Sequence, residues 1–134
     1  MSDMTEQLYD PLRKKGIPAT AEERVRQWFI RELLDTMRVP SHLMSSEAGF
    51  LYGRKRYRAD ILIFDRSGQA LAIVECKRPE VAITPDVAAQ ALRYDAVLSV
   101  RFIFLTNGKT TCAFKRNGDR FEALDHLPSY DEMI

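Results

Sequence analysis

Two short apolar runs on either side of a polar turn constrain the fold of this chain more than any other feature. The runs are ILIF at residues 61–64 and LAIV at residues 71–74, and a polar segment at residues 66–69 lies between them. Short, continuous runs rich in Ile, Leu, Val and Phe are typical of strands buried on both faces. The sequence therefore predicts a central hairpin of two buried strands joined by a four-residue loop.

Charged residues stand at the open end of this predicted hairpin. Because side chains alternate along a strand, Glu75 and Lys77 project from one face and Cys76 from the other. A four-residue loop places Asp60 opposite Glu75, whereas a shift of one residue would turn Asp60 to the wrong face. The favoured register brings two carboxylates and one ammonium group together.

Such a cluster suits a divalent cation. Adjacent carboxylates repel each other and are costly to desolvate, and Mg²⁺ binds a few carboxylate oxygens while taking other ligands from water and substrate phosphate. A metal-activated water beside a lysine can hydrolyse a phosphodiester. The alternative is a structural ion pair, which the short Glu-x-Lys pattern alone would favour. The presence of Asp60 in the preceding strand favours the metal site.

The same residues resemble a known nuclease motif. Asp60, a hairpin and then Glu75-Cys76-Lys77 resemble the PD-(D/E)XK motif, with Ala59 where the nominal proline would stand. Most of the chain resembles the N-terminal nuclease domain of type I restriction enzyme R subunits. The matching segments are EERVRQ at 22–27, Glu47, RYRADILIFD at 56–65, IVECKRP at 73–79, Gln90, Tyr94 and TNG at 106–108.

This resemblance implies a restriction-endonuclease-like α/β fold and Mg²⁺-dependent (or Mn²⁺-dependent) cleavage of DNA. Asp60, Glu75 and the Cys76 carbonyl would hold the metal ion. Lys77 would activate or orient the attacking water. Glu47 stands where the family carries a further acidic residue, as a metal ligand or a water-positioning group, and its alternative is an exposed strand glutamate.

The only dense basic run of the chain lies directly before Asp60. Positive charge beside the predicted metal site suits phosphate contacts, and an aromatic residue in the run suits packing on a sugar or base. The alternative is a solvated hairpin tip. The residues predicted to contact nucleic acid are Arg54, Lys55, Arg56 and Arg58, with Tyr57 among them.

Gln90 and Tyr94 are four residues apart and share one face of a predicted helix. The resemblance implies that Gln90 orients the water or Lys77 and that Tyr94 contacts DNA. The alternative is that Tyr94 belongs to the core and Gln90 to its boundary.

Helices and further strands are predicted around the hairpin. A capping box at 20–23 begins an amphipathic helix that runs to about residue 37, and a Thr-Pro-Asp signal begins a second helix over 84–99. A strand at 101–105 follows, and a right-handed crossover places it parallel to the strand that carries Glu75. Strands are also expected at 110–115 and 120–124, and residues 45–51 are a candidate first strand. The expected fold is a mixed central sheet of about five strands flanked by helices.

Length and composition limit the functional classes. The 134 residues suit a single domain, which we place at 20–125, with an arm at 1–19 and a tail at 126–134 that frays. A net charge of +1 means that nucleic acid must bind a local patch. Without metal-ligand spacing, Cys76 and Cys112 are expected to be reduced. We expect a cytoplasmic protein with no signal peptide and no membrane segment.

The resemblance, and the rejection of one misleading motif, decide which partners and ligands we expect. Gly108-Lys109-Thr110 imitates the end of a P-loop, but Ile103 stands where a glycine is required and a strand follows, so we expect no ATP site. R subunits carry an ATP-driven translocase after this domain. Because this chain ends at Ile134 and has no P-loop, we expect one of three arrangements: a fragment, a free-standing relative that acts with restriction–modification partner subunits, or a homodimer in which each site cuts one strand. A non-catalytic module that binds nucleic acid or protein is the alternative function, and RNA is the alternative substrate.

Overall fold

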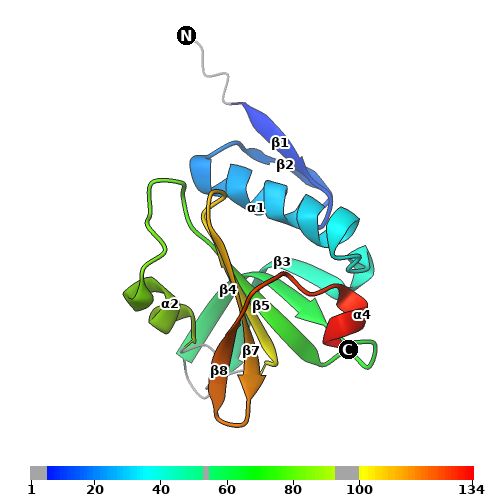
Figure 1. Cartoon of the computed structure of the whole chain (residues 1–134). Coiled ribbons are helices and arrows are strands. Elements are labelled where there is room, and N and C mark those ends of the chain that lie inside the picture. The colour runs from blue at the N-terminus through cyan, green and yellow to red at the C-terminus, as the bar shows by residue number, and fades with distance from the viewer. Residues whose placement is uncertain (1–5, 53–54, 93–99) are drawn as a thin grey trace.

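A six-stranded mixed sheet forms the centre of the protein (Figure 1). The computed structural model describes residues 6–52, 55–92 and 100–134, with the backbone alone for 48–52, 55–57 and 89–92. The strand order is β3-β4-β5-β6-β7-β8; β5 and β6 pair in parallel and the other neighbours are antiparallel. The strands are β3 (Met44–Tyr52), β4 (Lys55–Phe64), β5 (Ala70–Cys76), β6 (Phe102–Thr106), β7 (Thr111–Asn117) and β8 (Arg120–Leu124).

This architecture confirms the predicted α/β class and the parallel crossover. The sheet has six strands, where about five were expected, because β3 and β8 both join it as edge strands. The crossover from β5 to β6 includes α2 (Pro85–Leu92), which begins at Thr84 as predicted: the backbone N–H of Val87 donates to the Thr84 hydroxyl at 3.3 Å. The expected continuation of this helix over 93–99 lies outside the described residues.

The central hairpin keeps the predicted register at its open end but not at its turn. Ile61 pairs with Val74 and Ile63 with Ala72, which extends to Asp60 opposite Glu75. Near the turn, however, Phe64 pairs with Ala70, so the loop has five residues, 65–69. A β-bulge absorbs the extra residue on β5. Asp60 therefore keeps the predicted face although the loop length was wrong.

The first helix packs its apolar stripe against the sheet. In α1 (Ala21–Arg31) the Thr20 hydroxyl accepts a hydrogen bond from the Glu23 N–H at 3.1 Å, and a π-helical turn, Glu32–Thr36, continues the helix. None of the helices in the described ranges combines the length and apolar character needed to span a bilayer. The buried residues that join this helix to the sheet include Val25, Phe29, Ile30, Leu33, Met37, Ile61, Ile63, Phe102 and Phe104.

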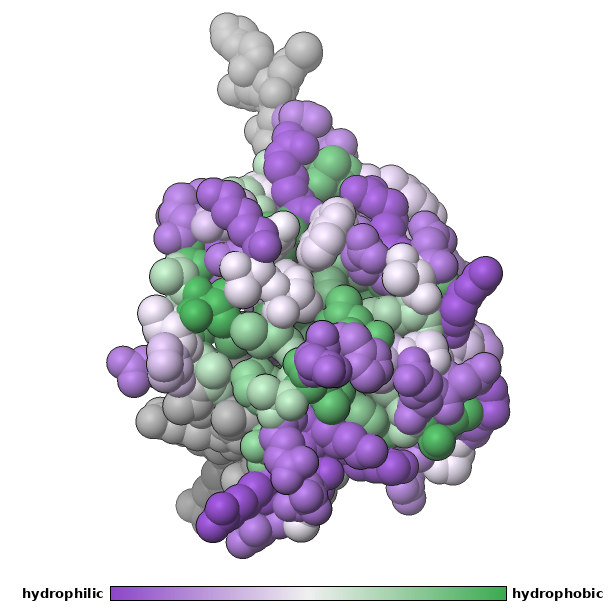
Figure 2. All heavy atoms as spheres, viewed as in Figure 1, coloured by the Kyte–Doolittle hydropathy of each residue, from purple (hydrophilic) through white to green (hydrophobic). Residues whose placement is uncertain are grey.

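Residues 6–18 form a second, two-stranded sheet against α1 instead of the expected loose arm (Figure 1). Its strands are β1 (Gln7–Asp10) and β2 (Lys15–Pro18). The reason is Asp10, whose fully buried carboxylate accepts hydrogen bonds from the backbone N–H groups of Leu12 at 2.8 Å and Arg13 at 3.2 Å. Such an aspartate replaces missing backbone partners and fixes the turn. Hydrophilic residues predominate at this end of the molecule in Figure 2, with hydrophobic ones among them.

Replacing Asp10 is expected to lower stability in a pH-dependent way. Burial raises the pKa of Asp10, but hydrogen bonds from Arg13 and Leu12 outweigh it and hold the pKa below the ordinary 3.8. A lowered pKa stabilises the folded state above that ordinary value, and the stabilisation is lost as pH falls through the folded-state pKa. We expect Asp10→Asn to cost about 1–3 kcal/mol at pH 7, and the deficit should shrink below about pH 4.

Denaturant titrations from pH 7 to pH 2.5 measure this difference. Asp119→Asn, in the exposed turn between β7 and β8, is the matched control and should unfold like the wild type at each pH. A deficit for Asp10→Asn that stays constant across this range would contradict the assignment.

The C-terminal residues also pack on the body instead of fraying. In α4 (Tyr130–Met133) a capping box joins Ser129 and Glu132. The backbone N–H of Tyr130 donates to the Met37 carbonyl at 2.7 Å, and its hydroxyl donates to the Phe64 carbonyl at 2.9 Å. Tyr130 and Met133 are both buried in the core, so this segment covers the end of α1 and the sheet.

Candidate active site

The ends of β4 and β5 place Asp60 and Glu75 side by side. The register of the hairpin puts the two residues opposite each other. One oxygen of Asp60, Oδ2, accepts a hydrogen bond from the backbone N–H of Cys76 at 2.7 Å. This contact holds the Asp60 carboxylate against the residue that directly follows Glu75. The structure therefore brings together the two carboxylates on which the predicted site depends.

Glu75 is a buried carboxyl group with one unpartnered oxygen. It is only 8% exposed, and among the described residues its Oε1 atom has no hydrogen-bond partner. Burial, and then the charge of Asp60, raise the pKa of Glu75 to about 8, against the opposing charge of Lys77. A buried polar atom without a partner costs free energy, and a carboxylate oxygen is a ligand that a hard divalent cation accepts. The donor set of Asp60, Glu75 and a backbone carbonyl thus fits Mg²⁺ or Mn²⁺.

Cys76 and Lys77 complete the end of β5. The Cys76 side chain belongs to the buried core, and burial raises the pKa of its thiol well above the ordinary value, so only its main-chain carbonyl suits a hard metal ion. Lys77 follows the last residue of β5, and its backbone N–H donates to the Thr106 carbonyl at 2.8 Å. This hydrogen bond continues the β5–β6 ladder and fixes where the lysine side chain leaves the sheet.

Arg26, which the sequence analysis missed, connects Asp60 to two other carboxylates. Its guanidinium comes from α1 and donates to Asp60 Oδ1 at 2.9 Å, to Glu23 Oε1 at 2.8 Å and to Glu47 Oε1 at 2.8 Å. Only 4% of the residue is exposed. The available signal was the segment EERVRQ, because Glu23 and Arg26 fall on the same side of α1 as the apolar stripe.

Glu47 lies opposite Asp60 on β3, in a backbone conformation that is unusual for a glutamate. The β3–β4 pairs Ser46–Ile61 and Ala48–Ala59 flank it, and its φ of +54° is in the left-handed region. Local strain of this kind is typical of functional sites, where the surroundings hold it in place.

The Glu47 carboxylate is held by arginines. It contacts Arg26, Arg58 and, at 3.4 Å, Arg13. Burial raises its pKa, but the hydrogen bond from Arg26 and the charges of the arginines outweigh this and hold the pKa of Glu47 below its ordinary value. In the described ranges no three side chains of His, Cys, Asp or Glu form a group that could hold a metal ion. A metal-ligand role for Glu47 stays a prediction.

Comparison with protein families identifies the domain. The family described as type I restriction enzyme R protein N terminus (HSDR_N) matches residues 21–128. The chain belongs to the HSDR_N family. The domain is therefore of the PD-(D/E)XK nuclease-like kind, as the residues around Asp60 and Glu75 indicated.

Solved structures share the fold of this HSDR_N domain. A fragment of a candidate HsdR subunit of a type I restriction enzyme from Vibrio vulnificus YJ016 matches with a TM-score of 0.56 and 20% identity, over 78% of this chain and 22% of that one. A candidate nuclease of the DUF820 group from Anabaena variabilis ATCC 29413 matches with a TM-score of 0.54 and 14% identity, over 96% of this chain and 84% of that one. The chain thus spans about a fifth of the Vibrio chain. No curated protein sequence matches it significantly.

The remaining predicted residues of the HSDR_N domain are placed only in part. Arg58 is exposed on β4 and pairs with Glu47, so it lies beside the Asp60 cluster. Only the backbone is described for Lys55 and Arg56, in β4, and for Gln90, in α2. Arg54 and Tyr94 lie outside the described residues.

Proposed function

We propose that this HSDR_N domain is a Mg²⁺-dependent endodeoxyribonuclease, which also accepts Mn²⁺. The observation that carries the proposal is the buried, unpartnered carboxyl oxygen of Glu75 beside the carboxylate of Asp60. Two such groups side by side destabilise each other when both are ionised. A divalent cation removes this penalty, whereas a purely structural role leaves it in place.

Each residue has a distinct role in the proposed reaction. Asp60, Glu75 and the Cys76 carbonyl would hold the metal ion. Once bound there, the ion would supply polarisation of the scissile phosphate and a lowered pKa for the attacking water. Lys77 orients the water and stabilises negative charge on the phosphate as it develops. Arg26 donates a hydrogen bond to Asp60 Oδ1 and so orients its carboxylate.

The other predicted residues bind the substrate or assist the water. Gln90 orients the water or Lys77, and Glu47 supports the site from β3. Residues 20–125 form the catalytic unit, which acts in the cytoplasm on DNA together with restriction–modification partner subunits or as a homodimer. The residues proposed to contact the nucleic acid are Arg54, Lys55, Arg56, Arg58 and Tyr94.

Metal binding and cleavage test this function together. Calorimetry should detect Mn²⁺ binding to the wild type and no binding to Asp60→Ala, because that variant loses one of the two ligating carboxylates. Supercoiled plasmid should be nicked with Mn²⁺ or Mg²⁺ and left intact with EDTA. Asp119→Ala, in the exposed β7–β8 turn, is the matched control and should bind and cleave like the wild type.

Two outcomes would decide against the enzyme. A wild type that binds no metal ion would remove the proposed metal site. Metal-independent binding of DNA without cleavage would favour the second candidate, a binding module on the same fold, which the basic run before Asp60 supports.

A further inference from the structure

We propose that the N-terminal hairpin β1–β2 is part of the active-site architecture, with Arg13 as a positioning residue for Asp60. The hairpin lies at residues 7–18, outside the 21–128 that match the HSDR_N family, so family membership assigns it no role. The inference rests on the proposed nuclease function and adds a structural control of its metal site. The side chain of Arg13 pairs with Asp10, Glu23 and Glu47, so it acts on Asp60 through other side chains.

Arg13 closes a ring of four alternating charges. One of its terminal nitrogens donates to Glu23 Oε1 at 2.7 Å and the other lies 3.4 Å from Glu47 Oε2. Arg26 donates to the same two side chains, to Glu23 Oε1 at 2.8 Å and to Glu47 Oε1 at 2.8 Å. Each carboxylate is therefore shared between the two guanidinium groups. The ring connects the hairpin, α1 and β3.

The ring reaches Asp60 through a single guanidinium. The second terminal nitrogen of Arg26 donates to Asp60 Oδ1 at 2.9 Å. A guanidinium is a rigid planar fork, so the direction of this bond depends on where the carboxylates on its other nitrogen are held. Because Arg13 binds both of those carboxylates, it helps to hold Arg26, and through Arg26 the Asp60 carboxylate, in this direction. Partners that orient metal ligands in this way typically change metal affinity by about 10–100-fold.

Arg13 is also held within its own hairpin. Asp10, which is fully buried, accepts hydrogen bonds from both the backbone N–H and the side-chain Nε of Arg13. The hairpin turn therefore presents its arginine in one orientation. A second ion pair, Arg24 with Glu6 at 2.5 Å, also ties the hairpin to α1 but touches no member of the ring. These two attachments allow docking of the hairpin to be separated from positioning of Asp60.

Mn²⁺ binding by calorimetry and plasmid nicking across a Mn²⁺ titration test this inference on the full chain. We expect Arg13→Ala to raise the dissociation constant for Mn²⁺ about tenfold, with a matching rise in the Mn²⁺ needed for half-maximal nicking. Arg24→Ala, which removes the other attachment, should stay within about twofold of the wild type in both measurements. If Arg13→Ala fails to fold by circular dichroism, Arg13→Lys provides the test. It keeps the charge but loses the fork, so we expect about threefold weaker Mn²⁺ binding.

The possible results separate the inference from the function beneath it. Unchanged Mn²⁺ binding in a folded Arg13 variant would overturn the inference and leave the nuclease proposal standing. Equal weakening in Arg13→Ala and Arg24→Ala would assign the effect to hairpin docking and also overturn it. A wild type that neither binds Mn²⁺ nor nicks DNA would overturn the proposed function and the inference with it.

Discussion

Replacing Lys77 by alanine should slow Mn²⁺-dependent nicking of supercoiled plasmid by about 10²–10³-fold, the usual loss for one preorganised electrostatic group. Lys77 follows directly after β5, and the hydrogen bond from its backbone N–H to the Thr106 carbonyl fixes where its side chain begins. Its charge already acts on Glu75 in the folded protein. Because the side chain is not buried, its removal leaves no cavity, and the fold should persist. The loss should therefore appear in the rate of cleavage and not in the melting temperature.

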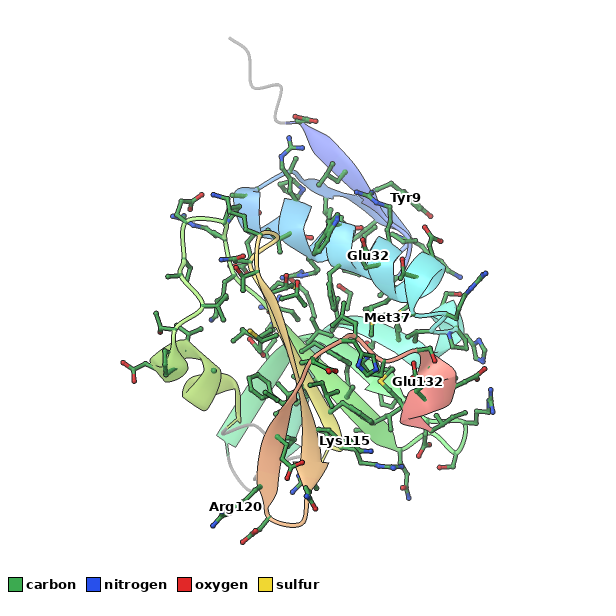
Figure 3. All side chains as sticks on the ribbon, viewed as in Figure 1. Tyr9, Glu32, Met37, Lys115, Arg120 and Glu132 are labelled. Atoms are coloured by element: carbon green, nitrogen blue, oxygen red, sulfur yellow. The ribbon has the colours of Figure 1, made fainter. Side chains whose placement is uncertain are left out.

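Lys115→Ala is the matched control for this prediction. Lys115 is exposed on β7 and pairs with Phe102, which lies at the other end of β6 from Thr106. Its label lies in the lower part of the sheet in Figure 3. This variant should nick plasmid at the wild-type rate. Equal nicking by Lys77→Ala and the wild type would indicate a contaminating nuclease and remove Lys77 from the site. No nicking by any of the three proteins, with DNA still bound, would contradict a nuclease that acts alone.

Replacing Arg26 by methionine should lower the free energy of unfolding by about 3–5 kcal/mol, the range found when one partner of a buried ion pair is removed. The substitution keeps an unbranched side chain of similar length but removes three charged hydrogen bonds, to Glu23, Glu47 and Asp60. Those carboxylates would then lie close together without their shared cation. Urea denaturation should show a lower midpoint with an unchanged slope, because the unfolded state exposes nearly the same surface.

Arg24→Met makes the same chemical change on the same helix at an exposed position. Both side chains of its ion pair with Glu6 are exposed, by 49% and 66%, so the free energy of unfolding should change by less than about 1 kcal/mol. Wild-type stability in Arg26→Met would show that the network around Arg26 does not hold the carboxylates as described. It would also weaken the argument that Arg26 positions Asp60.

The centre of the fold was predictable because its signals are local. A continuous apolar run of strand length has few alternatives to a buried strand, and both runs became β4 and β5. Alternation along β5 then placed Cys76 in the core, away from Glu75. The loop was wrong by one residue because nothing in the polar segment at 66–69 specifies a bulge. Asp65 shortens the pairing by accepting hydrogen bonds from the N–H groups of Ser67 and Gln69, both at 2.9 Å.

The packing of the two chain ends was not predictable, because it depends on contacts between segments that are distant in the sequence. Asp10 is indistinguishable in sequence from a solvated turn residue, and it is buried because Arg13 pairs with it. Near the other end, the Ser129 and Glu132 capping box is a local signal that the sequence contains. The burial of Tyr130, however, depends on the carbonyls of Met37 and Phe64, which belong to distant segments.

By itself the sequence determined the strands of the central sheet, the starts of α1 and α2, and the meeting of Asp60 with Glu75 at one end of a hairpin. These follow from side-chain periodicity and from caps, which act over a few residues. Only the tertiary structure decided which arginine side chains pair with the carboxylates of the site. Arg26 lies 34 residues before Asp60, and Arg13 reaches Glu47 from the separate hairpin. Ion pairing between distant segments leaves no periodic pattern in the chain, because it depends on how separately formed elements pack together.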